Sequence, residues 1–198
     1  MQRRGYTLLF TLLAGFFTAA QAEEKRIALE HPLVLADADR KTVSSNDFPG
    51  KLIYFGYTHC ADQCPTALSG MVEALAEVGP AADYIQPLFI AVDPERDRGA
   101  ALKDFTAAFD NRLIGLTGSP HQIAAAAEAL SIEYKKVLAG NDDYVIDHSS
   151  VMSLIGPDRG NVITFAFAEP YMIAAKLVAE LERAGVVLGN VNNLRTYR

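Results

Sequence analysis

The chain has two cysteines, and both lie where an apolar segment gives way to a helical one. Residues 52–55 form a short apolar run of the kind found in buried strands, and residues 66–78 carry apolar side chains at helical spacing. Cys60 and Cys64 fall on the turn between these segments. Such a turn exposes both sulfurs beside a helix N-terminus, where the helix dipole favours the thiolate over the thiol. We therefore expect a fold built around a strand–turn–helix unit that presents two sulfurs together.

Strand-like and helix-like segments continue to alternate along the chain. Strands are predicted at residues 33–35, 41–44, 52–55, 85–92, 113–116, 132–137, 144–146, 151–155 and 162–167. Helices are predicted at residues 66–78, 100–109, 120–130 and 170–183. This order predicts an α/β fold, a thioredoxin-like three-layer sandwich with a central mixed sheet. Residues 23–30 are expected to be frayed, and no structure is assigned from residue 185 on.

The N-terminal pattern divides the chain into two parts. Residues 1–22 have the pattern of a secretory signal peptide, because Arg3 and Arg4 precede an apolar run over residues 8–20 and the small-x-small motif Ala20-Gln21-Ala22. Residues 23–198 are long enough for one buried core and are predicted to form a single thioredoxin-like domain. The apolar run is shorter than the ~18 residues expected of a spanning helix. We expect an exported, periplasmic protein, with an uncleaved membrane anchor as the alternative.

The charge of the chain narrows the choice of partners. Its formal net charge is −6, which argues against nucleic acid and anionic membranes as partners. Membrane attachment is expected only if the N-terminal segment stays uncleaved. Outside the cytoplasm two cysteines can form a disulfide bond, and they bind metal only while reduced. The cysteine pair therefore has a redox switch built into it, whichever function it serves.

One histidine completes a set of soft ligands. His148 lies just before the predicted strand at residues 151–155, in a loop that this fold would place beside the cysteine turn. Two thiolates and a neutral imidazole suit Cu(I), and an added ligand would suit Cu(II). Cys60, Cys64 and His148 are therefore the candidate metal ligands, and Asp147 is a candidate for orienting the imidazole. A structural disulfide, a pair of inert buried cysteines and an ordinary histidine are the alternatives.

The other histidines and the core methionines have simpler interpretations. His59 is adjacent to Cys60, but the side chains of neighbouring residues usually diverge. Surface positions are expected for His31 and His121, and core positions for Met71 and Met152. Residues 93–97 follow the second long strand, on the same sheet edge as the cysteine turn. They form either a capped turn with a surface ion pair or a rim that supports the metal loop.

Three linked segments resemble the Sco family (also called SenC or PrrC), thioredoxin-fold proteins that handle copper for cytochrome c oxidase assembly. The segments are Gly56-Tyr57-Thr58-His59-Cys60-Ala61-Asp62-Gln63-Cys64-Pro65, Val92-Asp93-Pro94-Glu95-Arg96-Asp97 and Tyr144-Val145-Ile146-Asp147-His148-Ser149, the last followed by Leu154-Ile155-Gly156-Pro157. The resemblance implies copper bound by Cys60, Cys64 and His148. It also implies delivery of copper to, or thiol reduction of, the dinuclear copper site of the oxidase. The implied partners are a copper-receiving protein, such as a cytochrome c oxidase subunit, and a thiol-disulfide reductant.

The leading prediction is a copper-binding metallochaperone rather than an enzyme. A periplasmic thiol-disulfide oxidoreductase that acts through Cys60 and Cys64 is the alternative. His148 separates the two functions, because a reductase should tolerate its loss. A peroxidase would need an activating arginine near a reactive cysteine, and Arg96 is the nearby candidate.

Overall fold

The computed structural model of the chain describes residues 25–140, 143–159, 161–189, 191 and 194. Its strands are β1 (Lys25–Ile27), β2 (Val34–Asp37), β3 (Thr42–Ser44), β4 (Gly50–Gly56), β5 (Ile85–Ala91), β6 (Ile114–Thr117), β7 (Tyr134–Gly140), β8 (Asp143–His148), β9 (Val151–Ile155) and β10 (Val162–Ala166). Its helices are α1 (Gln63–Val78), α2 (Ala100–Ala107), α3 (Pro120–Ala129) and α4 (Pro170–Arg183), with short 3-10 helices η1 (Ser45–Asp47) and η2 (Gly79–Tyr84). The predicted signal peptide lies outside the described residues.

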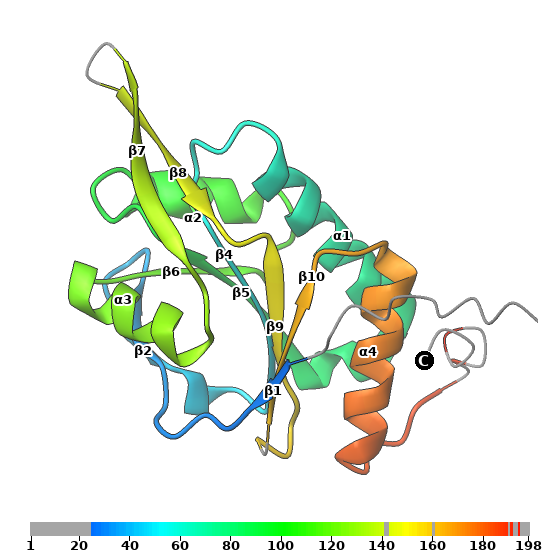
Figure 1. Cartoon of the computed structure of the whole chain (residues 1–198). Coiled ribbons are helices and arrows are strands. Elements are labelled where there is room, and N and C mark those ends of the chain that lie inside the picture. Colours follow the sequence, from blue (N-terminus) through cyan, green and yellow to red (C-terminus); the bar gives the residue numbers. More distant parts are fainter. Residues whose placement is uncertain (1–24, 141–142, 160, 190, 192–193, 195–198) are drawn as a thin grey trace, which may run out of the picture.

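The main sheet has a parallel centre and antiparallel flanks. Its strand order is β1-β10-β9-β4-β5-β6-β2-β3, and β7 pairs with β8 in a separate hairpin. Strands β4, β5 and β6 run parallel, and the other neighbours in the sheet run antiparallel. Helices α1 and α4 pack together on one side of the sheet, and α3 lies on the other (Figure 1). The predicted thioredoxin-like three-layer sandwich with a central mixed sheet is confirmed.

Strand β4 lies at the centre of the core. All of its residues are buried, and it pairs with β5 from Gly50 opposite Ile85 to Gly56 opposite Ala91. Because parallel strands end at the same edge of a sheet, the loops that follow β4 and β5 lie side by side. The Val92 N–H donates to the Gly56 carbonyl oxygen at 2.8 Å and joins the starts of these loops. The cysteine turn and residues 93–97 therefore meet at one edge.

The β7–β8 hairpin projects from the body of the molecule (Figure 1). It replaces the two shorter strands that the sequence predicted at residues 132–137 and 144–146. At its base, Tyr134 pairs with His148, the last residue of β8. The hairpin therefore ends where the chain returns to the sheet, and it carries His148 to that edge.

Two further differences between prediction and structure concern the N-terminal segment and the start of α1. Residues 23–30 are not frayed throughout, because β1 pairs antiparallel with β10. The sequence Lys-Arg-Ile has no strand pattern of its own, and this strand forms through pairing with a segment far along the chain. Helix α1 begins at Gln63 instead of residue 66, so that Cys64 lies within its first turn. Among the described residues, none of the helices combines the length and apolar character that a membrane span requires.

Candidate metal centre

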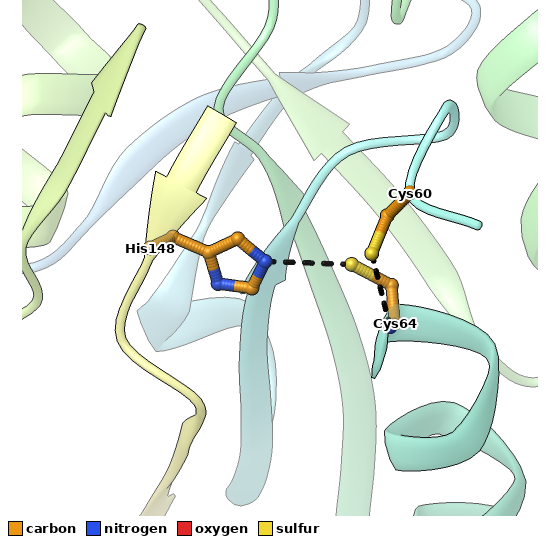
Figure 2. A group of neighbouring side chains, drawn as sticks. All are labelled: Cys60, Cys64 and His148. Atoms are coloured by element: carbon orange, nitrogen blue, oxygen red, sulfur yellow. Dashed lines mark hydrogen bonds between the residues drawn. The ribbon is translucent and has the colours of Figure 1, made fainter. Parts of the chain in front are cut away.

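Cys60, Cys64 and His148 converge on one point at the edge of the sheet (Figure 2). Cys60 lies in the loop after β4, Cys64 in the first turn of α1, and His148 at the end of β8. The Cys64 Sγ is 3.5 Å from the His148 Nε2, and the three candidate ligand atoms all lie within 4.8 Å of one another. The structure therefore brings together the three residues that the sequence proposed as ligands.

The absence of a side chain at Gly56 leaves space for the Cys64 sulfur. Cys64 is fully buried, whereas Cys60 is half-buried. The Cys64 backbone N–H donates to the Cys60 Sγ at 3.3 Å, which holds the two sulfurs on the same side of the turn. A Cβ atom at Gly56 would lie 2.8 Å from the Cys64 Sγ and 2.9 Å from the Phe89 ring. Any side chain at residue 56 would therefore displace the Cys64 sulfur or Phe89.

Burial, rather than the helix dipole, dominates the ionisation of Cys64. The sequence predicted that the α1 N-terminus would favour the thiolate, and at Cys64 burial acts in the opposite direction. Burial raises the pKa of the Cys64 thiol, and its hydrogen bond with Cys60 raises it further, although a backbone hydrogen bond at Tyr57 opposes them. Both cysteines are free thiols in the structure. Because a metal ion supplies the positive charge that a buried thiolate lacks, metal binding would release the thiol proton.

The backbone orients the imidazole of His148. Its Nδ1 lies 3.2 Å from the Ser149 carbonyl oxygen, and a proton donated there leaves the Nε2 lone pair facing Cys64. Burial lowers the pKa of His148, which favours the neutral ring that a metal requires. Asp147, the candidate for orienting the ring, does not do so in this structure, because its carboxylate pairs with Lys135 at 3.3 Å.

Two tyrosine rings flank the imidazole. The rings of Tyr54 and Tyr57 meet His148 edge-on, with centroid separations of 5.9 and 6.1 Å. Within the described part of the chain, the buried Tyr54 hydroxyl has no hydrogen-bond partner. Burial raises the pKa of Tyr54 above its ordinary value, so this hydroxyl keeps its proton at neutral pH. Both tyrosines are buried, so this side of the imidazole packs against aromatic rings.

A buried carboxylate supports the cysteine turn. Asp97 is fully buried and accepts hydrogen bonds from the Thr58 N–H at 2.9 Å and from the Thr58 hydroxyl at 2.6 Å. Burial raises the pKa of Asp97, while both bonds from Thr58 lower it. Residues 93–97 show features of both interpretations, because they form a turn with the Asp93–Arg96 ion pair and also hold the cysteine turn through Asp97. Thr58 was missed by sequence reasoning, since nothing in its neighbourhood marks it as the partner of a residue 39 positions away.

Arg96 and Tyr144 connect the same loop to the hairpin. The Arg96 guanidinium donates to the Tyr144 carbonyl oxygen at 3.3 Å and lies 3.8 Å from the centre of the Tyr144 ring. The Tyr144 hydroxyl donates to Asp93 at 3.0 Å, and Asp93 also forms an ion pair with Arg96. The loop at residues 93–97 therefore holds the cysteine turn through Asp97 and the His148-bearing strand through Arg96.

The remaining candidate residues lie outside the cluster. The side chain of His59 is 56% exposed, with its Nδ1 3.1 Å from the Thr58 hydroxyl. His31 and His121 are exposed, as the sequence predicted. Met71 and Met152 are fully buried in the core, which confirms their packing role. Arg96, the arginine that a peroxidase would need, forms an ion pair with Asp93 and donates a hydrogen bond to the Tyr144 carbonyl oxygen in this structure.

The donor set fits a soft metal. Two sulfurs and one imidazole nitrogen match the preference of Cu(I) for thiolate and imidazole ligands, and three protein ligands leave a position for an incoming group. The described residues contain no other group of three or more histidine, cysteine or acidic side chains with ligand atoms this close. The candidate metal centre is therefore the point where the loop after β4, the first turn of α1 and the end of β8 meet.

Comparison with known sequences points to one family. The SCO1/SenC family model matches residues 21–183. An SCO2-like protein of Rickettsia prowazekii is 35% identical over 173 residues, which cover 85% of this chain and 81% of that protein. The mitochondrial SCO1 homolog 1 of Arabidopsis thaliana is 37% identical over 140 residues, which cover 69% of this chain and 42% of that protein. The chain thus matches less than half the length of the plant relative.

Comparison with solved structures gives the same result. The structure of Bradyrhizobium japonicum ScoI with copper bound is 38% identical, with a TM-score of 0.69 over 78% of this chain and 100% of that chain. Arabidopsis thaliana ScoI with copper bound is 32% identical, with a TM-score of 0.72 over 79% of this chain and 99% of that chain. Both similarities extend over most of the described fold.

Proposed function

Because the chain belongs to the SCO1/SenC family, we propose that Cys60, Cys64 and His148 bind one copper ion, which the protein carries as its cargo. The observation that carries this proposal is the convergence of two sulfurs and one imidazole nitrogen within 4.8 Å. The Sco family comprises copper-binding proteins linked to cytochrome c oxidase assembly. Two of the similar structures were solved with copper bound.

The proposed recipient is a cytochrome c oxidase subunit with a dinuclear copper site. The protein would deliver copper to that site or keep its thiols reduced, with a thiol-disulfide reductant restoring Cys60 and Cys64 after oxidation. Family membership and the half-exposed Cys60 support this proposal, because a carrier needs a ligand that a partner can reach.

The residues of the chain have separate roles in this function. On binding copper, the Cys60 and Cys64 thiols would lose their protons to solvent and bind as thiolates, and His148 would offer its Nε2 while the Ser149 carbonyl oxygen fixes the ring. Copper supplies the positive charge that balances the buried Cys64 thiolate. The hydrogen bonds that Thr58 donates to Asp97 hold the cysteine turn in place.

Copper titration of the reduced protein tests the proposal. We expect one tight copper per chain, with a thiolate charge-transfer absorption when Cu(II) is bound. Cys60→Ser, Cys64→Ser and His148→Ala should each weaken binding by at least the ~10–100-fold typical of changes around a metal site. His121→Ala, an exposed histidine outside the cluster, is the matched control and should bind copper normally. Copper binding that is indifferent to His148 would contradict the proposed site.

A thiol-disulfide oxidoreductase is the second candidate function. It is favoured by one observation, the two free cysteines held together at a helix N-terminus by the Cys64 N–H to Cys60 Sγ hydrogen bond. A disulfide-reduction assay separates the two functions. Rapid reduction that survives His148→Ala, together with weak copper binding, would favour the oxidoreductase and exclude the copper carrier.

We also propose that the protein is exported to the periplasm and that residues 1–22 are removed. The support is the sequence pattern of these residues. Fractionation of cells followed by mass measurement of the protein would test this. A chain that begins at residue 23 in the soluble periplasmic fraction is the expected result, and a full-length chain retained in the membrane fraction would show that the segment acts as an anchor.

A further inference from the structure

A lysine is buried at the end of β4 that lies away from the cysteines. Lys51 is the second residue of this strand, and its side chain is 1% exposed. Its one hydrogen bond among the described residues goes from Nζ to the Pro49 carbonyl oxygen at 3.4 Å. An ammonium group has three donors, so most of the hydrogen-bonding capacity of this buried side chain is unused.

A small cavity adjoins this lysine. Its volume is about 170 Å³, and its lining includes Lys51, Ser45 and Arg159. Arg159 lies in the exposed turn between β9 and β10 and donates one hydrogen bond to the Asn46 carbonyl oxygen. The buried Ser45 hydroxyl accepts a hydrogen bond from the Leu33 N–H, and its own proton has no acceptor in the described residues. Three groups with unused donors therefore line one cavity.

The two cations at this cavity, Lys51 and Arg159, form no ion pair within the described part of the chain. Glu30 and His31 also line the cavity, but both are exposed, and the Glu30 carboxylate makes no ion pair with either cation. Burial, with a further contribution from the charge of Arg159, lowers the pKa of Lys51 to about 8. Lys51 and Arg159 therefore lack an ion-pair partner among the described residues, and the acidic side chain in the lining, Glu30, is exposed.

We propose that this cavity binds a small oxyanion, held by the Lys51 ammonium and the Arg159 guanidinium, with the Ser45 hydroxyl as a further donor. An oxyanion would supply the missing negative charge and accept the unused hydrogen bonds, and a guanidinium is well suited to binding carboxylate or phosphate oxygens. The cavity holds the equivalent of a few waters of about 30 Å³ each, which matches an ion the size of phosphate or acetate. The site is independent of the proposed copper function, because it lies at the other end of β4.

Thermal unfolding in the presence of anions tests the site. A ligand that binds only the folded chain raises Tm in proportion to the logarithm of its concentration once it exceeds Kd. The full protein would be unfolded in a zwitterionic buffer with increasing inorganic phosphate, acetate or chloride at constant ionic strength. We expect phosphate or acetate to raise Tm by several degrees relative to chloride, and calorimetric titration to give one site per chain. A rise with phosphate alone identifies a phosphate-type ligand, and a rise with acetate alone identifies a carboxylate.

Variants make the test specific. Lys51→Met and Arg159→Gln should each abolish the anion-dependent rise, whereas Arg98→Gln, an exposed arginine at the opposite edge of the sheet, should keep it. Arg159 is exposed, so its variant is informative even if the Lys51 variant folds poorly. Equal responses to all three anions, or a rise that persists in Arg159→Gln, would overturn the proposal. Copper binding measured on the same samples should be unchanged, which distinguishes this outcome from failure of the copper site.

Discussion

The proposed metal site depends on a residue without a side chain as well as on the side chains of its ligands. Gly56 is the clearest case, because the space where its side chain would lie is taken by the Cys64 sulfur and the Phe89 ring. Gly56→Ala should cost roughly 1–3 kcal/mol of stability through overpacking and weaken copper binding. Chemical denaturation and copper titration would measure both effects.

Gly189 provides the control for this substitution. A Cβ atom there meets nothing within 4 Å, so Gly189→Ala should leave both properties unchanged. Wild-type copper affinity in Gly56→Ala would show that the position of the Cys64 sulfur does not determine metal binding.

The lowered pKa of Lys51 should make the free energy of unfolding depend on pH. Its pKa is lowered from 10.5 to about 8 in the folded chain, a difference that corresponds to about 3 kcal/mol. Between these pH values the unfolded chain holds a proton that the folded chain has lost, so the free energy of unfolding should rise with pH from about 8 to 10.5. Lys51→Met should remove this rise and be more stable at pH 7.

Denaturant unfolding at a series of pH values, in a buffer without phosphate or carboxylate, measures the effect. Lys103→Met is the matched control, because the Lys103 side chain is 62% exposed and pairs weakly with Asp39. A wild-type curve that stays flat from pH 8 to 10.5 would mean that Lys51 is not desolvated in solution.

At the scale of elements, the loop at residues 93–97 links the cysteine turn to the β7–β8 hairpin. Asp97→Asn keeps the size of the side chain but replaces one acceptor oxygen with a donor, which leaves a Thr58 donor unsatisfied. We expect a loss of roughly 1–3 kcal/mol in stability and weaker copper binding. Asp104→Asn, at an exposed position in α2, is the control. Unchanged copper affinity in Asp97→Asn would show that the turn holds its geometry without this support.

Arg96 should act on the hairpin. Arg96→Ala removes the hydrogen bonds to the Tyr144 carbonyl oxygen and the contact with the Tyr144 ring. Amide hydrogen exchange in β7 and β8 should then accelerate while β4 and β5 remain protected. Lys135→Ala removes only an exposed ion pair with Asp147 and serves as the comparison. If the amides of β7 and β8 exchange at the same rate in both variants, the hairpin is held by its own strand pairing and not by Arg96.

The elements differ in how far the sequence predicted them. The helix predicted at residues 120–130 is present as α3 (Pro120–Ala129), and its start is fixed locally by the capping box between Ser119 and Gln122. Strand β1 was missed because its order comes from β10, and pairing between distant segments leaves no local pattern. The sequence predicted the convergence of Cys60, Cys64 and His148. In the predicted fold, the cysteine turn and the loop before residues 151–155 lie side by side. The bonds of Thr58 to Asp97 and of Arg96 to Tyr144 depend on side-chain packing between loops, which periodicity does not encode.

In the whole molecule, β4 separates the two proposed sites, which differ in chemistry. Lys51 lies near its start and Cys60 follows its end, and the rise of about 3.3 Å from each of its seven residues to the next places the ends of the strand about 20 Å apart. No residue is shared by the two sites. Copper affinity measured with and without saturating phosphate should therefore agree within error. A tenfold difference would reveal a coupling free energy of about 1.4 kcal/mol carried through the sheet.

Because Cys64 is buried and Cys60 is half-buried, a partner would reach the proposed copper site from the side of Cys60. A partner that approaches the edge of the sheet can touch Cys60, whereas Cys64 lies behind it with no exposed surface. Ligand exchange with a partner would therefore begin at Cys60 and end at Cys64, so that the outer thiolate is the first to gain or lose the metal and the inner one is the last. Copper transfer at this site would be stepwise. Every partner, whether it brings copper or takes it away, would have to approach through Cys60.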